Sequence, residues 1–387
     1  MPLDFPAPPP LGLYVHLPWC VRKCPYCDFN SHPLGDHDPP EQAYVSALLA
    51  EAAARAAQVA GRPVCSVFIG GGTPSLFSPA AIARLLDGLA EHFMLAPGAE
   101  ITLEANPGTL DAARLSGFRS AGINRLSLGV QSFNDRCLRA IGRIHDVQQA
   151  LDAVRAARRA GFDNLNLDLM FGLPGQDLQE AEEDLATAIA LAPEHLSWYQ
   201  LTIEPGTTFA VRPPTLPDEA LCWAMFAQGR SRLAAAGYTQ YEVSAYARPG
   251  YRCQHNENYW CYGDYVGLGA GAHGKVTDHC TGRIVRSRNL RSPARYMDCV
   301  RRGGGYDEQW QVGGQDAVFE FMLNALRLTE GFRMALFRER TGLPERVLEG
   351  RLQTPVAQGL VSVQAGRVRP TALGRRFLDD LTACFLP

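Results

Sequence analysis

The sequence predicts an α/β fold class, a partial (β/α)6 TIM-like barrel with an appended small α+β winged-helix-like C-terminal domain. The first observation is that short apolar or β-branched runs alternate with longer segments of helical period between about residues 12 and 247. The second is the number of units, because six are too many for a small doubly wound sheet and too few for a complete eight-fold barrel. The third is a change of pattern near residue 315, where helical segments precede a hairpin.

The barrel prediction rests on six strand candidates. They are LGLYVHLP from Leu11, CSVFIGG from Cys65, EITLEAN from Glu100, NRLSLGVQ from Asn124, NLNLDLMFGLP from Asn164 and LSWYQLTI from Leu196. Helical segments begin at Glu41, Ser78, Asp146 and Asp177, and several start with the Asp or Ser that favours an N-cap. A seventh strand, YTQYEVSAYA from Tyr238, is expected to close this part of the chain.

The remaining segments predict the domain organisation. Residues 1–11 are Pro-rich and are expected to form a disordered leader, and residues 12–247 form the partial barrel. Residues 248–314 are rich in Gly, Arg and aromatic residues, which predicts a connecting region of loops and short strands. Residues 315–387 are expected to form the C-terminal domain, with a hairpin that turns at Ala365 and Gly366.

The composition excludes several classes of protein. Of the 387 residues, 46% are hydrophobic and 20% are charged, which is typical of globular protein and unlike disordered or fibrous chains. No run approaches the ~18 apolar residues of a membrane span, and the N-terminus lacks a signal-peptide pattern. We therefore expect a cytoplasmic protein, in which the eleven cysteines act as metal ligands, reactive groups or core residues.

The charge is distributed unevenly along the chain. Residues 251–387 carry 19 Lys and Arg against 14 Asp and Glu, although the whole chain has a net charge of −3. Such an arginine-rich surface could contact anionic lipid, propionates or nucleic acid. A winged module also raises the hypothesis of a DNA-binding regulator, but its arginines are scattered rather than gathered on the second helix. We therefore expect no nucleic-acid partner.

A cysteine motif carries the strongest functional signal. Cys20, Cys24 and Cys27 form a C-x3-C-x2-C set directly after the first strand candidate. Zinc would need a fourth ligand, for which the neighbourhood offers Asp28 or His32. An iron–sulfur cube held by three thiolates instead leaves one iron open to chelate a small molecule. The motif therefore predicts a [4Fe-4S] cluster, with structural zinc as the alternative.

Polar residues and glycines follow the ends of the next strand candidates. The second strand ends in Gly70, Gly71 and Gly72, followed by Thr73, and this run lets backbone approach a ligand closely. Glu104 ends the third strand, Gln131 ends the fourth, and Asp168 lies on the fifth. Because a barrel builds its active site at the carboxyl ends of its strands, these groups are expected to converge on one mouth.

The segment YVHLPWCVRKCPYCDFN resembles the signature of the radical SAM superfamily. The resemblance implies that S-adenosylmethionine (SAM) chelates the open iron through its amino and carboxylate groups. Matched residue by residue, the superfamily's SAM-contacting set falls on Tyr14, Gly71, Gly72, Thr73, Glu104, Gln131, Arg143 and Asp168. By the same resemblance, Glu104, Gln131, Arg143 and Asp168 would hold the ribose and the charged methionyl groups, as hydrogen-bonding chemistry allows.

Within the superfamily, the similarity narrows to the coproporphyrinogen oxidase-like branch and covers nearly the whole chain. HemN, the coproporphyrinogen III dehydrogenase, has another cysteine two positions after the third ligand, where this chain has Phe29. HemN also has a long segment before the cluster, whereas 19 residues precede Cys20 here. The HNxxYW string of residues 255–260 is instead similar to the HemW family, whose members are haem chaperones.

The chemistry of HNxxYW agrees with a haem ligand. A neutral imidazole such as that of His255 is a standard axial ligand of haem iron, and Tyr259 and Trp260 offer flat faces for a macrocycle. Two alternatives remain open, a packed core histidine and a metal site of Cys253, His255 and Cys261. The arginines that could pair with propionates are Arg248, Arg252, Arg283, Arg286 and Arg288. His273 lies in a glycine-rich loop that could face the barrel mouth.

The resemblance therefore implies a haem chaperone of the HemW type. It would bind a [4Fe-4S] cluster, SAM and haem, and deliver haem to respiratory apoproteins, with a peripheral contact at the inner membrane as a further expectation. The alternative is a radical SAM coproporphyrinogen III oxidase that decarboxylates propionates, so whether the protein is an enzyme stays open. Phe29 and the short N-terminus favour the chaperone.

Overall fold

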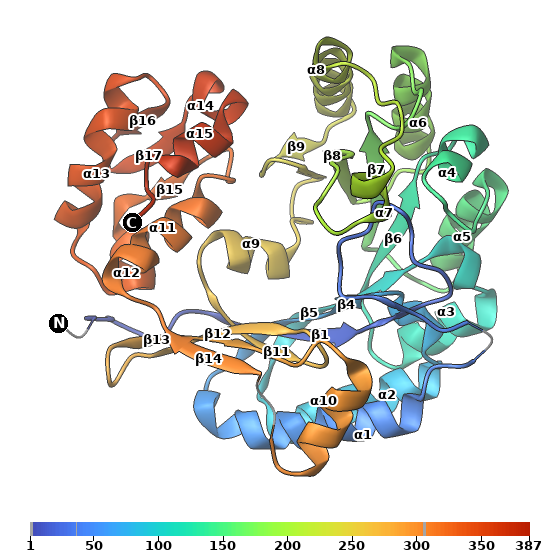
Figure 1. The fold of residues 1–387 in the computed structure, drawn as a ribbon, viewed down its shortest axis with the longest axis horizontal. Helices are drawn as coiled ribbons and strands as arrows, with labels where there is room; N and C mark the ends of the chain where they lie inside the picture. The colour runs from blue at the N-terminus through green and yellow to red at the C-terminus, as the bar shows by residue number, and fades with distance from the viewer. Residues whose placement is uncertain (1–2, 36, 305–306) are drawn as a thin grey trace.

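A computed structural model describes residues 3–35, 37–304 and 307–387. Six parallel strands form the centre of a twelve-stranded sheet, in the order in which they occur in the chain (Figure 1). They are β1 (Leu11–Leu17), β4 (Val64–Gly71), β5 (Leu95–Ala105), β6 (Arg125–Gln131), β7 (Leu165–Phe171) and β8 (His195–Gln200). The predicted six-unit partial barrel is confirmed.

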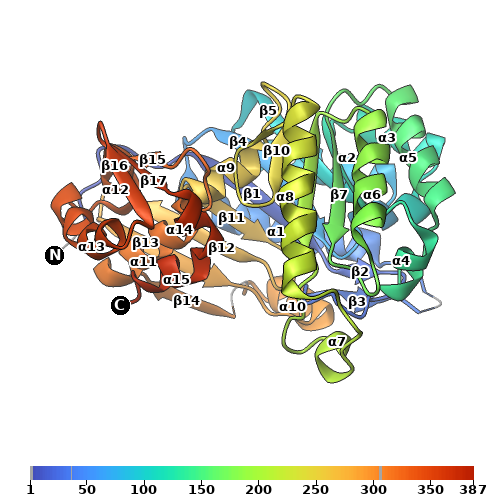
Figure 2. The ribbon, with the colours of Figure 1, turned by 90° about the horizontal axis from the view of Figure 1, so that it is seen from above.

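Helices follow these strands and cover one face of the sheet, except for the short α7, which lies apart from that layer (Figure 2). They are α1 (Glu41–Ala56), α2 (Pro79–His92), α3 (Ala112–Ser120), α4 (Asp135–Ala140), α5 (Val147–Arg159), α6 (Leu178–Ala190), α7 (Thr208–Val211) and α8 (Glu219–Ala235). Single 3-10 turns lie at η1 (Ala57–Val59), η2 (Pro74–Leu76) and η3 (Pro107–Thr109). Asp146 and Asp177 each begin a helix with a full capping box, which confirms the N-cap prediction.

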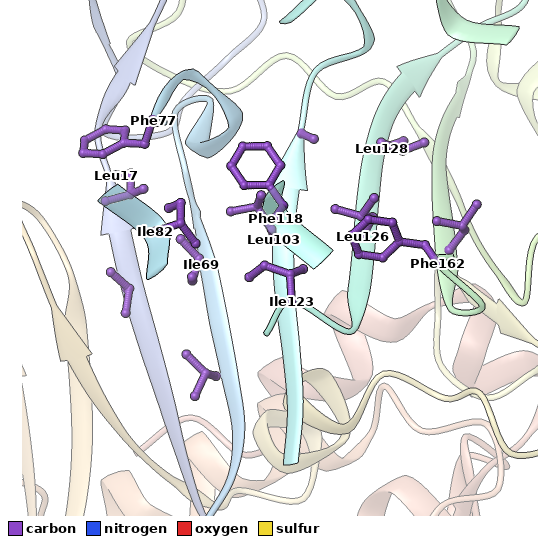
Figure 3. Packing of buried hydrophobic residues seen from close by; sticks show 14 of the residues in the cluster. Leu17, Ile69, Phe77, Ile82, Leu103, Phe118, Ile123, Leu126, Leu128 and Phe162 are labelled. Atoms are coloured by element: carbon purple, nitrogen blue, oxygen red, sulfur yellow. The ribbon is translucent and has the colours of Figure 1, made fainter. Parts of the chain in front are cut away.

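The main core lies between the parallel strands and these helices. Strand residues such as Leu103 and Leu126 pack against helix residues such as Ile82 and Phe118, and all four are fully buried (Figure 3). Burying each such side chain contributes about 1.5–3 kcal/mol relative to leaving it in water. The strands are buried on both faces: in β6, Leu126 and Leu128 belong to this core, whereas Arg125 and Ser127, which alternate with them, are buried polar residues.

The seventh strand that the sequence predicts from Tyr238 is two shorter strands. They are β9 (Thr239–Gln240) and β10 (Ala245–Ala247), and β10 pairs with β8 in the antiparallel direction. The chain is diverted between them because Glu242 forms an isolated bridge with Leu328 and its carboxylate accepts a hydrogen bond from the backbone N–H of Ser244. This end of the barrel therefore finishes in an antiparallel edge.

The predicted connecting region, residues 248–314, extends the barrel sheet beyond its other end. Strand β11 (Asp264–Leu268) lies parallel to β1, and β12 (His273–Asp278), β13 (Arg283–Arg288) and β14 (Glu308–Gln311) follow as antiparallel strands. Two helices complete the region, α9 (Gln254–Trp260) and α10 (Pro293–Arg301). The sequence predicts loops and short strands here, but not that these strands continue the barrel sheet, which they do because the edge of β1 pairs with β11, a contact far apart in sequence.

The C-terminal domain has its own core and lies beside β13 and α9 (Figure 1). Its helices are α11 (Gly314–Ala325), α12 (Met334–Thr341), α13 (Glu345–Ala357), α14 (Ala372–Arg376) and α15 (Leu378–Ala383). Strands β15 (Phe332–Arg333), β17 (Arg367–Pro370) and β16 (Val361–Gln364) form a small sheet. Ala365 and Gly366 both have positive φ, as the predicted tight hairpin turn requires.

The described part of the leader differs from the disordered segment expected for residues 1–11. Phe5 is buried in the core of the C-terminal domain, and the backbone N–H of Asp4 donates to the carbonyl oxygen of Gly342 at 2.9 Å. The apolar Phe5 side chain gains burial that the proline content of the leader does not suggest. Across the described residues, the helices are too short or too polar to span a bilayer.

Candidate functional site

The loop that carries the three motif cysteines is fixed at its base. It starts at β2 (Trp19–Cys20), which pairs with β3 (His32–Pro33) on the far side of the loop. The backbone N–H of Leu34 donates to the carbonyl oxygen of Cys20 at 2.9 Å, and that of Cys27 donates to Cys24 at 3.1 Å. The loop is therefore a closed structure that holds its cysteines at defined places after β1. We call residues 19–33 the cysteine loop.

The three thiols line one cavity of about 550 Å³. A side chain with a hydrogen-bond donor lies near each sulfur: Thr73 Oγ1 is 3.4 Å from Cys20 Sγ, Arg143 Nη1 is 3.7 Å from Cys24 Sγ, and Ser31 Oγ is 3.8 Å from Cys27 Sγ. Burial raises the pKa of the free Cys20 and Cys27 thiols, so bound metal would be needed to hold them as thiolates. The hydrogen-bond donors beside the three sulfurs would therefore stabilise them as metal-bound thiolates.

The positions of these side chains also distinguish a site for an iron–sulfur cube from a site for a single metal ion. Within the described ranges, no three Cys, His, Asp or Glu side chains converge closely enough to enclose one metal ion. The His32 ring lies 3.3 Å from the carbonyl oxygen of Arg291, so it is occupied as a hydrogen-bond partner. A cube binds each thiolate to a different iron and needs no common point. The residues present therefore fit an iron–sulfur cube better than the zinc alternative with Asp28 or His32.

The strand ends bring the polar residues of the sequence prediction to the same cavity. Its wall includes Gly71, Gly72, Thr73, Glu104, Gln131, Arg143 and Asp168, together with the three cysteines. Tyr14 lines two adjoining cavities, each of which shares Glu104 with this one. The geometry thus places all the predicted cofactor-binding residues except His255 at one mouth.

Hydrogen bonds hold these polar side chains in place. Glu104 Oε2 accepts from the backbone N–H of Gly71 at 3.0 Å, and Asp168 Oδ1 accepts from Asn166 Nδ2 at 2.8 Å. Burial, and then the neighbouring Asp168 carboxylate, raises the pKa of Glu104 to about 7. Arg143 donates Nη2 to the carbonyl oxygen of Gly129 at 2.6 Å, while its buried Nε has no partner among the described residues. An unpaired buried donor at this mouth is available to an anionic ligand.

Gln131, which the sequence predicts at the mouth, is held there by Tyr199, which the sequence analysis did not single out. Gln131 has φ of 71°, a left-handed conformation that a residue with a side chain adopts at a cost. Its Oε1 accepts from the Tyr199 hydroxyl at 2.8 Å. Tyr199 lines the cavity and was missed in the sequence, although its position at the end of the sixth strand was a usable signal.

The glycines at the end of β4 are required by close packing. Gly71 has φ of 118°, and a Cβ on Gly72 would lie 2.5 Å from the carbonyl oxygen of Trp19. The backbone N–H of Thr73 donates to that same oxygen at 2.7 Å. The glycine run therefore lies directly against the base of the cysteine loop, and no side chain fits between them.

Gly72→Ala is expected to displace the cysteine loop. Because the added methyl meets backbone rather than a movable side chain, the substitution should destabilise the fold by about 1–3 kcal/mol and lower iron retention after anaerobic reconstitution. Gly350→Ala is the matched control, since a Cβ there meets open space on α13 and should raise stability by up to about 1 kcal/mol. Urea unfolding and iron analysis of both variants check this result, and equal iron content would contradict it.

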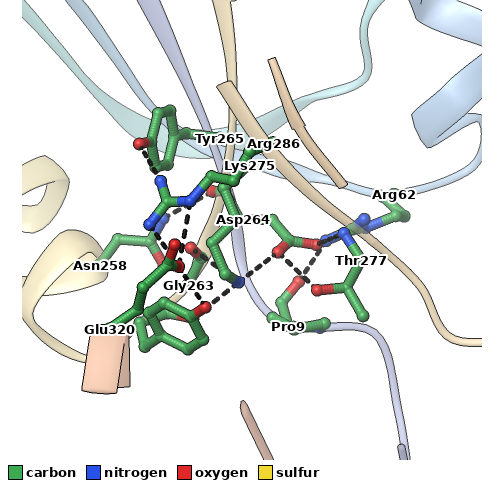
Figure 4. Close-up of polar contacts among 11 residues, drawn as sticks. Pro9, Arg62, Asn258, Gly263, Asp264, Tyr265, Lys275, Thr277, Arg286 and Glu320 are labelled. Carbon is green, nitrogen blue, oxygen red and sulfur yellow. Dashed lines mark hydrogen bonds and ion pairs between the residues drawn. The ribbon is translucent and has the colours of Figure 1, made fainter. Parts of the chain in front are cut away.

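The HNxxYW segment forms α9, which is tied to β11. Asn258 Nδ2 donates to the carbonyl oxygen of Asp264 at 2.8 Å (Figure 4). The Asp264 carboxylate accepts from Lys275 Nζ at 2.9 Å and from Arg62 Nη2 at 2.8 Å, deep in the structure. Arg286, nearby, pairs with Glu320 of α11 at 2.7 Å. A buried charge network therefore joins α9, the extended sheet and the C-terminal domain.

His255 lies inside the barrel. Its ring is stacked against Phe68 with centroids 5.0 Å apart, Nδ1 lies 3.0 Å from Ser66 Oγ, and only 3% of the residue is exposed. Nε2 is buried and has no hydrogen-bond partner among the described residues. Burial, with a smaller contribution from Arg125, lowers the pKa of His255 to about 3, so the ring is neutral. The residue lines a cavity of about 310 Å³, but this nitrogen is not exposed in it.

The neighbouring cysteines show no sign of the alternative metal site. The Cys253 thiol is buried 3.5 Å from Glu100 Oε1, and the described His, Cys, Asp and Glu residues include no convergent trio.

The arginines proposed for propionates are mostly occupied: Arg252 pairs with Glu257 and Glu330, Arg286 with Glu320, and Arg288 with Asp307 and Glu308. Arg248 lies over the Tyr238 ring.

Comparison with known proteins defines the class first. Residues 14–188 match the Radical SAM superfamily, and residues 314–377 match the HemN C-terminal domain. The solved structure of coproporphyrinogen III oxidase (HemN) from Escherichia coli, a radical SAM enzyme, is similar with a TM-score of 0.82 and 26% identity, covering 98% of this chain and 90% of that one. The chain is therefore a radical SAM protein with a HemN-type C-terminal domain.

Similarity over the full length defines the family within that class. The chain is 50% identical to the heme chaperone HemW of Escherichia coli K12 over 98% of both chains. It is 47% identical to HemW of Haemophilus influenzae over 98% of this chain and 99% of the relative. It is 34% identical to HemW of Bacillus subtilis over 96% and 98%, respectively. The chain belongs to the HemW family.

Proposed function

We propose that this protein is a haem chaperone that binds a [4Fe-4S] cluster on Cys20, Cys24 and Cys27, binds SAM beside it, and delivers haem to respiratory apoproteins. The observation that carries this proposal is the 50% identity, over 98% of both chains, to a curated heme chaperone. The single cavity that joins the three thiols to the strand-end polar residues supports the cofactor part. We further propose that delivery takes place in the cytoplasm at the inner membrane surface.

The bound cluster would supply an iron without a protein ligand, to which a small chelating molecule can coordinate. The chain's own residues would orient SAM around it. Glu104 and Asp168 are placed to accept hydrogen bonds from ribose hydroxyls, and Arg143 has an unpaired Nε for the methionyl carboxylate. The backbone of Gly71 and Gly72 offers a surface without side chains to the same cavity.

A coproporphyrinogen III oxidase remains the second candidate function, because the HemN structure matches nearly the whole chain. Two observations favour the chaperone over it. The identity to HemW of Escherichia coli is 50%, whereas the identity to HemN of the same organism is 26%. Phe29 stands where HemN has an additional cysteine, and its side chain is 60% exposed at the edge of the cysteine cavity.

A transfer assay tests the proposal. Anaerobically reconstituted protein, loaded with haem and freed of excess by gel filtration, should convert an apo-cytochrome to its haem-bound spectrum faster than an equal amount of haem on serum albumin. The same preparation given dithionite, SAM and coproporphyrinogen III should yield no protoporphyrinogen. Absence of transfer would contradict the chaperone function, and formation of protoporphyrinogen would establish the oxidase instead.

A further inference from the structure

A second cavity adjoins the cysteine cavity on its outer side. It measures about 390 Å³, within the range of ligand pockets, and shares Phe29, Gly71 and Glu104 with the first. Its far wall is formed by Tyr259 of the HNxxYW segment, and by His273, Arg288 and Arg291 of the extended sheet and the loop after it. We call it the outer pocket.

His273 is the accessible imidazole of this region. Its side chain is exposed, and neither ring nitrogen has a hydrogen-bond partner in the part of the chain that the structure describes. The other histidine of the outer pocket, His16, is engaged on both nitrogens, by the Tyr14 hydroxyl and by the carbonyl oxygen of Asn30. His255 is buried and lines a different cavity. A ligand that enters from solvent therefore meets His273 first.

The cations around His273 favour its neutral form. Arg288 lies directly opposite His273 in the β12–β13 pair. Partial burial of the ring against the pocket wall, followed by Arg288 and its neighbours Arg286 and Arg291, lowers the pKa of His273. A neutral imidazole keeps a lone pair for a metal, as axial ligation of haem iron requires.

Arg291 offers a charge that the protein leaves unused. Its Nε lies 3.4 Å from Asn30 Oδ1, and no carboxylate of the described residues pairs with its guanidinium. Arg288, in contrast, is already shared between Asp307 and Glu308. An exposed guanidinium without a carboxylate partner at the rim of a pocket is suited to a carboxylate ligand.

The walls of the outer pocket are aromatic and held in place. Phe29 is 60% exposed, and Tyr259 stacks on Tyr265 with ring centroids 4.2 Å apart. Asn30 ties the cysteine loop to the opposite wall, because its Nδ2 donates to the carbonyl oxygens of Ala270 and Arg291 at 3.0 and 2.9 Å. The outer pocket therefore joins flat apolar faces, an imidazole without a hydrogen-bond partner among the described residues, and a guanidinium without a carboxylate partner among them, and Asn30 holds these walls together.

We propose that the outer pocket is the haem site, with His273 as ligand of the iron and Arg291 as partner of a propionate. This inference rests on the proposed haem-carrying function and names the site for it. The sequence predicts His255 as the ligand, and this inference replaces it with His273. In the outer pocket the HNxxYW segment would contact the macrocycle through Tyr259 rather than through His255.

Titration of the reconstituted full-length protein with ferric protoporphyrin IX, followed by the Soret band and by electron paramagnetic resonance, tests the ligand. His273→Ala should remove the imidazole-ligated spectrum and weaken haem binding about ten-fold or more, while leaving metal-free protoporphyrin IX binding unchanged. His279→Ala is the matched control, because His279 is exposed at the other end of the same hairpin. His273→Met should shift the spectrum instead of abolishing it, which separates ligand loss from misfolding.

The propionate contact is tested with the same probes. Arg291→Gln should weaken both haem and metal-free protoporphyrin IX about ten-fold, and should not change binding of the protoporphyrin dimethyl ester. Arg295→Gln, an exposed arginine on α10 outside the pocket, should leave all three unchanged.

The outcomes distinguish the inference from the function it rests on. If the parent protein binds no haem, the proposed haem-carrying function is overturned. If the parent binds haem, and His255→Ala removes the imidazole spectrum while His273→Ala keeps it, the proposed function stands and the outer-pocket site is wrong. Retained binding of metal-free protoporphyrin IX by His273→Ala, with loss of the iron ligand, supports the site.

Discussion

Alanine at any one of Cys20, Cys24 and Cys27 should reduce the iron and acid-labile sulfide of anaerobically reconstituted protein to background. A cube held by three thiolates has no protein ligand in reserve, and the structure places all three cysteines on the wall of one cavity. Loss of a single ligand therefore removes the cluster rather than a fraction of it. Absorbance in the visible range and elemental analysis of iron, sulfide and zinc measure the result.

Cys280→Ala is the matched control for these variants. Cys280 is exposed in the turn between β12 and β13, away from the cysteine cavity, so its variant should keep the iron and sulfide of the parent. The zinc alternative predicts a different result, in which the parent holds zinc without sulfide, and Asp28→Ala or His32→Ala also loses the metal. Zinc at one equivalent per chain, with no sulfide, would overturn the cluster assignment.

The barrel could be predicted because its strands are buried on both faces. Segments such as LGLYVHLP and NLNLDLMF carry an aliphatic residue at every second position, and their spacing by helical segments leaves few other arrangements. The convergence of the polar residues on one mouth could be predicted from the same geometry, since residues that end parallel strands meet at one edge. Glu104 and Asp168 line a common cavity for this reason.

The parts that could not be predicted depend on contacts between distant segments. β11 joins β1 across some 250 residues, and its sequence, DYVGL, is followed by a glycine-rich loop that resembles a connection. A Cβ on Gly267 would lie 1.9 Å from the carbonyl oxygen of His273, so glycine there reflects tight packing rather than a flexible loop. The pairing state of each arginine likewise depends on tertiary neighbours, which is why Arg291 was not among the propionate candidates.

The largest effect on stability is expected at Asp264, which carries the buried charge network that fixes β11 and β12. Its carboxylate accepts from Lys275, of which only 1% is exposed, and also from Arg62 and Thr277 (Figure 4). Asp264→Asn would leave the Lys275 ammonium buried beside neutral acceptors. Breaking a buried pair in this way typically costs about 3–5 kcal/mol, which should appear as a lower urea midpoint. Asp152→Asn, at an exposed ion pair on α5, is the control and should leave the midpoint unchanged.

Two further measurements connect this loss to the charge itself. Asp264→Asn combined with Lys275→Met should recover part of the stability, because the methionine side chain fills much of the same space without a buried charge.

Burial alone would raise the pKa of Asp264, but Lys275 and Arg62 outweigh it and hold the pKa below the usual 3.8. The stabilising effect of the carboxylate is therefore present above about pH 4 and is lost as the pH falls through the folded-state pKa. The gap between parent and Asp264→Asn should accordingly stay constant near neutral pH and narrow in acid. A gap independent of pH down to the acid transition would show that hydrogen-bond geometry, rather than charge, makes Asp264 important.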